Sequence, residues 1–207
     1  MERCLEIGKE NIRHHLPIPF LVSVFVFILT PFLMGTTNLS AAETAQVLEY
    51  YTVFPGIILL VPIFLPEQNK DIHDMIYSKY TNPTVIYGVR LIMALLVMMG
   101  CLWSFMMMLN GGNCDFPFVK YYFGTLAGMI FLGGIGMLGY AVSNNPVIGY
   151  MVPMIYYIVN IAGGKKYLGN FYLFSMMQGE FIEKWYLFGS GVLCMAAGIF
   201  LWSRKER

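Results

Sequence analysis

The sequence predicts an all-α integral membrane protein with six transmembrane helices. Of its 207 residues, 57% are hydrophobic and only 12% are charged, which is about half the charged share of a soluble domain. A spanning helix needs roughly 20 mostly apolar residues, and apolar runs of about that size fill most of the chain. Lys plus Arg (13) nearly equals Asp plus Glu (12), so no basic surface for nucleic acid is indicated.

The spans are predicted in order from the apolar runs. They are residues 18–34, 48–65, 85–109, 122–142, 147–162 and 185–202. Pro55 and Pro62 should kink the second span, with Glu49 at its membrane interface. Trp185 and Trp202 flank the sixth span, as expected for an aromatic belt.

The segments outside the spans are unequal. Residues 1–16 are amphipathic and are predicted to form a helix on the membrane surface. Residues 35–47 and 110–121 form short outer loops, and residues 66–84 form a long polar inner loop. Residues 163–184 are too aromatic for a free loop and too interrupted for a span. Short helices re-entering the outer leaflet are therefore expected there. The whole chain, 1–207, forms one transmembrane domain.

The distribution of basic residues predicts that both termini are cytoplasmic, because inner loops carry an excess of Lys and Arg. Nine basic residues would lie inside and four outside. The inner residues would be Arg3, Lys9, Arg13, Lys70, Lys79, Arg90, Arg204, Lys205 and Arg207. The outer residues would be Lys120, Lys165, Lys166 and Lys184.

The predicted span interiors contain no ionisable residue, which removes the usual basis for a proton relay or for buried metal or haem ligands. Arg90 should reach the inner interface by snorkelling. The Gly124–Gly128 pair indicates either a dimer seam or, as the favoured interpretation, a close crossing within one subunit. Ser190 lacks a histidine partner, so the Gly-Ser-Gly stretch around it indicates helix packing rather than a protease.

Three polar residues of the fifth span, Tyr156, Tyr157 and Asn160, fall within five positions. Local hydrogen bonding is the favoured interpretation of these side chains. The functional alternative is an aromatic and polar wall along the path of an amphipathic substrate.

The inner loop predicts a short amphipathic helix. Glu67, Asp71 and Asp74 suit a helix N-terminal end, and Ile72, Met75 and Ile76 follow i, i+3, i+4 spacing on one face. The break comes at residues 81–83, Thr-Asn-Pro. Such a helix either rests on the lipid surface or docks a soluble partner.

With this loop in place, the chain resembles the ABC type-2 (ABC-2) permease family, the membrane subunits of ATP-driven exporters. The resemblance lies in the layout of the whole chain and, locally, in residues 65–68, Leu-Pro-Glu-Gln, through Ser78-Lys79 to Arg90-Leu91. It implies that residues 67–76 couple the chain to separate ABC ATPase subunits. It also implies a second, identical or different permease subunit, with the substrate pathway between the two.

The functional expectation is a permease of a bacterial cell membrane that exports a peptide, drug or lipid-like substrate. The chain would not itself be an enzyme and would hold no cofactor, because ATP and Mg²⁺ would bind the partner ATPase. The alternative is a membrane immunity or scaffold protein that binds a toxin peptide without transporting it. A membrane enzyme is the third class, and the sequence offers no reactive constellation for it.

Overall fold

The computed structural model describes residues 9, 11–13, 15–68 and 83–205. All regular structure among them is helical. The elements are α2 (Pro17–Met34), α3 (Ala41–Tyr50), α4 (Phe54–Leu60), η1 (Val61–Gln68), α6 (Pro83–Gly111), α7 (Phe118–Ser143), α8 (Pro146–Leu168), η2 (Gly169–Phe171), η3 (Met176–Gln178) and α9 (Ile182–Lys205). Six helical stretches of the described chain are long and apolar enough to cross a membrane, which confirms the predicted number.

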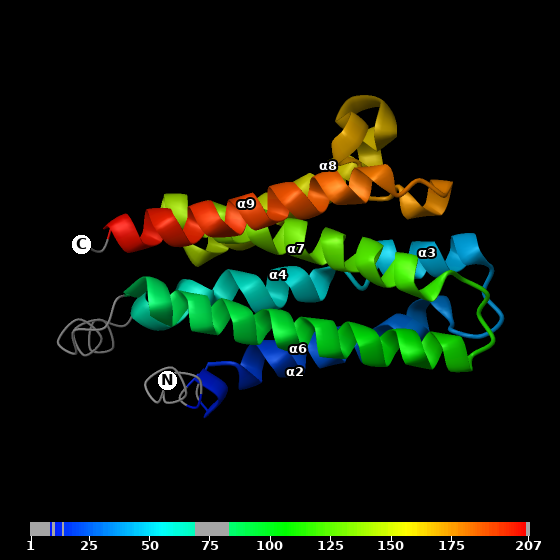
Figure 1. Cartoon of the computed structure of the whole chain (residues 1–207), viewed down its shortest axis with the longest axis horizontal. Coiled ribbons are helices and arrows are strands. Elements are labelled where there is room, and N and C mark those ends of the chain that lie inside the picture. Colours follow the sequence, from blue (N-terminus) through cyan, green and yellow to red (C-terminus); the bar gives the residue numbers. More distant parts are fainter. Residues whose placement is uncertain (1–8, 10, 14, 69–82, 206–207) are drawn as a thin grey trace.

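The long helices run side by side, and the bundle has two distinct ends (Figure 1). At one end α2 begins, η1 ends, α6 begins and α9 ends; we call it the terminal end. The turn between α7 and α8 lies there too, because Lys205 Nζ donates to the carbonyls of Ala141 and Val142 at 2.7 and 2.9 Å. The α2–α3 and α6–α7 connections and the start of α9 lie at the opposite end, which we call the loop end.

The second spanning stretch, Ala41–Pro66, is broken twice. α3 starts at a capping box in which Ser40 and Glu43 bond each other's backbone N–H. Turn residues 51–53 separate α3 from α4, just before Pro55, and the backbone tightens to a 3₁₀ helix at Val61, just before Pro62. Prolines disturb the preceding helical turn, so the predicted kinks are confirmed. The prediction that residues 35–47 form a loop was wrong in part, since α3 occupies residues from Ala41 onward.

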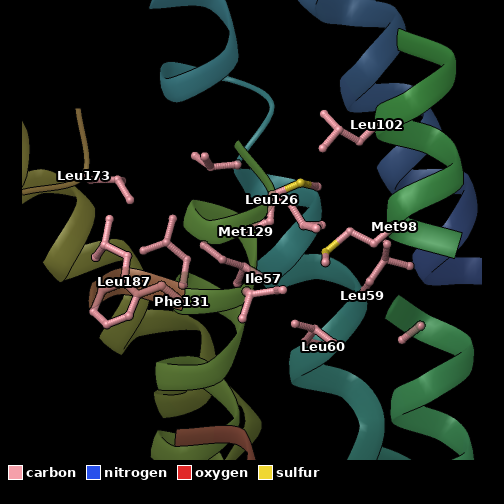
Figure 2. Packing of buried hydrophobic residues seen from close by; sticks show 14 of the residues in the cluster. Ile57, Leu59, Leu60, Met98, Leu102, Leu126, Met129, Phe131, Leu173 and Leu187 are labelled. Atoms are coloured by element: carbon pink, nitrogen blue, oxygen red, sulfur yellow. The ribbon is translucent and has the colours of Figure 1, made fainter. Parts of the chain in front are cut away.

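α7 is the central helix of the bundle: 78% of its most apolar 18-residue stretch is buried within the chain. Its glycines allow backbones to approach closely. A Cβ on Gly134 would lie 2.5 Å from the carbonyl oxygen of Gly191 in α9, and one on Gly136 would lie 2.9 Å from that of Gly149 in α8. Around these crossings, buried side chains from α4, α6, α7 and α9 interlock (Figure 2).

An aromatic cluster holds the bundle near the terminal end. Trp202 stacks on Phe64 with ring centroids 4.8 Å apart, and its Nε1 donates to the Tyr87 hydroxyl at 3.1 Å. Trp202 is buried, so its predicted place in an aromatic belt was wrong; Trp185 is 77% exposed, as a belt residue would be. Arg90 is also buried and donates to the carbonyl of Ile63 at 3.2 Å, so it does not snorkel.

Candidate functional site: a buried ion pair and the segment it holds

Two opposite charges meet inside the protein at the loop end. Glu49, in the last turn of α3, is 0% exposed, and Lys184, in the first turn of α9, is 5% exposed. Lys184 Nζ lies 2.6 Å from Glu49 Oε1. The sequence placed Glu49 at the membrane interface and Lys184 outside the sixth span; both lie in helical stretches that extend beyond the predicted apolar runs, and their burial within the protein was not predicted.

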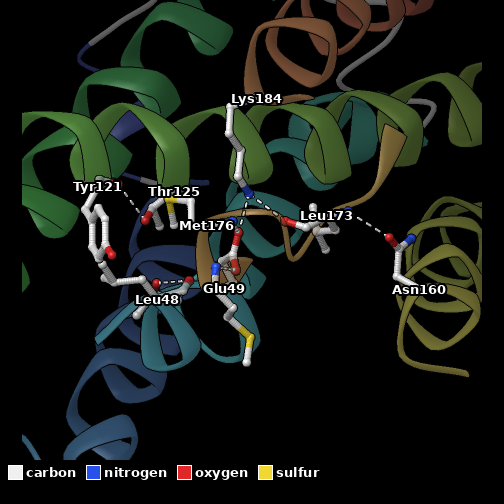
Figure 3. A network of polar contacts seen from close by, with 10 residues as sticks. Leu48, Glu49, Tyr121, Thr125, Asn160, Leu173, Met176 and Lys184 are labelled. Carbon is white, nitrogen blue, oxygen red and sulfur yellow. Dashed lines mark hydrogen bonds and ion pairs between the residues drawn. The ribbon is translucent and has the colours of Figure 1, made fainter. Parts of the chain in front are cut away.

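Every oxygen of the Glu49 carboxylate has a partner (Figure 3). Oε1 accepts from the backbone N–H of Met176 at 2.9 Å, and Oε2 accepts from that of Met177 at 3.2 Å. Lys184 Nζ in turn donates to the carbonyl oxygen of Leu173 at 2.5 Å. Removing a charge from water costs several kcal/mol unless the charge is paired and hydrogen-bonded. The charges of Glu49 and Lys184 are both paired and hydrogen-bonded.

The ion pair holds one stretch of backbone, residues 172–178, which enters the protein between α3, α7 and α8. We call it the inserted segment. Leu173, Phe174, Ser175 and Met176 are all at most 1% exposed. Phe174 stacks on Tyr50 of α3 with ring centroids 4.6 Å apart and meets the edge of Tyr157 of α8. Such irregular backbone is tolerated within a membrane protein only where protein or water covers it.

The Gly124–Gly128 pair of α7 makes room for the inserted segment. A Cβ on Gly124 would lie 2.2 Å from Met176 Sδ, and one on Gly128 would lie 3.5 Å from Leu173 Cδ1. These glycines therefore form a close contact within the subunit. Of the two interpretations left open by the sequence, the intramolecular one is correct for this pair.

The three polar residues predicted on the fifth span also hold this region. Asn160 is fully buried; its Oδ1 accepts from the N–H of Leu173 at 2.8 Å. The Tyr156 hydroxyl donates to the carbonyl of Phe171 at 2.5 Å, and the Tyr157 hydroxyl to that of Tyr50 at 2.8 Å. Their polar groups are thus occupied within the chain, as in the local interpretation; a substrate path along them stays a prediction.

A second, more exposed set of charges lies beside the buried pair. α8 kinks at Gly164, whose φ is +60°. Lys165, the next residue, forms an ion pair with Glu180 and a second one with Glu183, at 3.0 Å. The segment predicted at 163–184 therefore consists of the kinked end of α8, the short helices η2 and η3, and the first turn of α9.

The residues predicted to couple to an ATPase fall on another part of the chain. Glu67 belongs to the last turn of η1, at the terminal end. Asp71, Ile72, Asp74, Met75 and Ile76 lie outside the described residues. The same is true of most of the predicted interfacial helix 1–16, of which Lys9 and residues 11–13 are helical. Ser190 donates to the carbonyls of Tyr186 and Leu187, as expected of a packing residue.

The sequence analysis missed the ion pair, although a signal was present. Glu49 and Lys184 are opposite charges, each next to a predicted apolar run and each on the predicted outer side. The pairing depends on the inserted segment, whose sequence shows no helical or strand periodicity. The contact could therefore not be predicted from the apolar run beside Glu49 or from the one beside Lys184. With all carboxylate oxygens bonded, the pair can act as a clamp, and it has no free site with which to relay a proton.

No protein-family model matches the chain, and no curated protein or solved structure shows significant similarity to it.

Proposed function

We propose that the chain is the membrane subunit of an ABC exporter of the ABC-2 type. It moves a peptide, drug or lipid-like substrate, with energy from a separate ATPase. The observation that carries the proposal is the position of the connection between η1 and α6. η1 ends and α6 begins at the terminal end, where α2 begins and α9 ends (Figure 1).

The layout gives that connection a mechanical role. The second spanning stretch is broken at residues 51–53 and at Val61, and it ends in the 3₁₀ helix η1. 3₁₀ segments are frequent at helix ends and as connectors between helices. Residues 67–80, docked on an ATPase, would pull on η1 on one side and on α6 on the other. In this proposal residues 66–84 are cytoplasmic, as are both termini, and residues 1–16 lie on the inner membrane surface.

The packing of one subunit supports a pathway between two of them. α7 is filled on several sides by its own chain: α4, α8, α9 and the inserted segment reach its glycines. By contrast, only 17% of the most apolar 18-residue stretch of α2 is buried within the chain, and only 22% of the corresponding stretch of α8. A second permease subunit, identical or different, would cover one of these faces. The segment 163–184 would lie on the outer side as a re-entrant cap over the exit.

The test is co-purification of a candidate ABC ATPase, chosen by its phosphate-binding loop and co-expressed with the permease, at equal permease yield. Replacing Ile72 and Ile76 by alanine should lower ATPase recovery at least tenfold, because each truncated apolar contact typically costs about 1–3 kcal/mol. The matched control replaces Ile182 and Val119 by alanine. Both are exposed at the loop end, so ATPase recovery should not change.

Equal ATPase recovery from the Ile72/Ile76 variant and the control would contradict the coupling role. Failure of the wild-type chain to recover any ATPase, combined with capture of a toxin peptide, would instead establish the immunity or scaffold alternative.

A further inference from the structure

A cavity of about 480 Å³ opens between the start of α6 and the end of α9, at the terminal end. Its lining residues are Thr84, Ala196, Ile199, Phe200, Ser203 and Arg204. Small-molecule sites typically have volumes of about 300–1,000 Å³. The cavity is far from the ion pair, and the function proposed above makes no use of it.

The polar and apolar lining residues lie at different positions along the axis of α9. Ala196, Phe200 and Arg204 follow i, i+4, i+8 spacing, so they form one stripe on α9. At a rise of about 1.5 Å per residue, this stripe runs about 12 Å from the cation into the apolar part of the bundle. Ile199 widens the apolar wall, whereas Thr84, Ser203 and Arg204 are the polar residues of the lining. The cavity therefore has a polar mouth and an apolar wall.

Among the described residues of this lining, Arg204 is the charged one. Its neighbour Lys205 is occupied by the carbonyls of Ala141 and Val142. Within residues 9–68 and 83–205, as far as these are described, no hydrogen bond or ion pair engages the Arg204 guanidinium. Within the same described residues, no hydrogen bond engages the Thr84 hydroxyl. The mouth thus presents a cation and a hydroxyl, and none of the described lining residues carries a carboxylate.

From these features we propose that the cavity binds an anionic phospholipid. The phosphate sits against Arg204 and Thr84, and one acyl chain lies along Phe200, Ile199 and Ala196. Arginine at the end of the last span lies at headgroup level, where basic groups between helices attract anionic lipid. A guanidinium donates charge-assisted hydrogen bonds to phosphate oxygens. A zwitterionic headgroup would gain less, because it carries its own cation.

The experiment is native mass spectrometry of the full chain in detergent, titrated with phosphatidylglycerol or phosphatidylcholine of the same acyl chains. The first phosphatidylglycerol should bind with a dissociation constant at least fivefold below that of phosphatidylcholine. Arg204→Gln should abolish this preference, since one basic group near a lipid headgroup is worth about fivefold in affinity. Lys166→Gln, which removes the same charge at the other end, should retain it.

The apolar wall is tested separately by Ala196→Phe, which fills the cavity, against Ala197→Phe on the neighbouring exposed position outside the lining. The first should weaken the binding of both lipids, and the second should leave both unchanged. Inorganic phosphate and glycerol phosphate, which lack acyl chains, should not displace the lipid at millimolar concentration.

Three results would overturn the proposal. They are equal affinity for the two lipids, an equal effect of Arg204→Gln and Lys166→Gln, and displacement by inorganic phosphate alone. The last would identify a simple anion site.

Discussion

Different kinds of interaction stabilise the two ends of the bundle: a buried ion pair at the loop end and aromatic contacts near the terminal end. At the loop end, one carboxylate and one ammonium, both buried, bond backbone groups of the inserted segment. Near the terminal end, stacked and edge-on rings of Phe64, Tyr140 and Trp202 fill the core. Ring contacts are individually modest, whereas a buried charge that loses its partner is heavily penalised. Stability should therefore respond to loss of Lys184 at the loop end far more than to changes among the rings near the terminal end.

The largest effect is expected from Lys184→Ala. It leaves Glu49 buried without its cation and should lower the free energy of unfolding by about 3–5 kcal/mol. The measurement is unfolding in mixed detergent micelles. The double variant Glu49→Gln with Lys184→Met should recover most of the loss, because it buries no charge and its glutamine can still accept from Met176. Lys166→Ala, at an exposed lysine, should change little. A double variant no more stable than Lys184→Ala would contradict the charge argument.

The next largest loss of stability is expected where α7 crosses α9, between the two ends of the bundle. Gly134→Leu places a side chain where a Cβ would lie 2.5 Å from the Gly191 carbonyl oxygen. Overpacking of this kind costs up to about 3 kcal/mol. A Cβ on Gly189, two residues before Gly191 on α9, would meet nothing within 4 Å, so Gly189→Leu should be nearly neutral in the same unfolding assay. Similar losses in both variants would contradict a specific role of the contact at the crossing, because Gly→Leu by itself raises helix propensity.

A smaller loss is expected at the edge of the inserted segment. Asn160→Leu removes the acceptor of the Leu173 N–H, and an unsatisfied buried donor costs about 2 kcal/mol. Proteolysis or hydrogen exchange should show opening of residues 172–178 while the aromatic cluster stays protected. Asn170→Ala, at an exposed position of η2, serves as the control. Uniform loss of protection over the whole chain would show that the segment does not open by itself.

The smallest effect is expected at the terminal end. Tyr87→Phe deletes the hydroxyl that accepts from Trp202 Nε1 at 3.1 Å, and loss of the acceptor of a buried donor costs about 1–3 kcal/mol, so the loss should be no larger than that of Asn160→Leu. The stacking of Trp202 on Phe64 should survive, which near-ultraviolet circular dichroism would report. A loss as large as that of Lys184→Ala would remove the contrast between the two ends.

Much of the fold could be predicted from local pattern. Apolar runs alone gave the number of spans, and Pro55 and Pro62 located the breaks in the second one. What could not be predicted depends on contacts distant in sequence. Glu49 was assigned to an interface because a lone carboxylate in an apolar run is costly. Its cost is offset by Lys184 and by two N–H groups of the inserted segment, none of which shows in the pattern around residue 49. Trp202 was misplaced for a similar reason, since its acceptor, Tyr87, lies on α6.

The candidate site divides in the same way. Tyr156, Tyr157 and Asn160 stood out as a polar cluster on one span, and the structure joins all three to backbone carbonyls or N–H groups of the loop end. The coupling residues 71–76 were proposed from helical spacing and from the resemblance to the ABC-2 permease family, and they lie outside the described part of the chain. Their role depends on which side of the membrane the terminal end faces.

That orientation is the most direct test of the proposed function, because an ATPase can engage residues 67–80 only if the terminal end is cytoplasmic. Native Cys114 is a poor reporter, since it is buried and its Sγ lies 3.4 Å from the Thr36 carbonyl. Single cysteines in a cysteine-free background serve better: Asp115→Cys at the loop end and Asn145→Cys in the turn between α7 and α8, both at exposed positions. An impermeant thiol reagent added to intact cells should label Asp115→Cys and should label Asn145→Cys only after permeabilisation. The reverse pattern would place residues 67–80 outside the cell, away from ATP, and would contradict the exporter proposal.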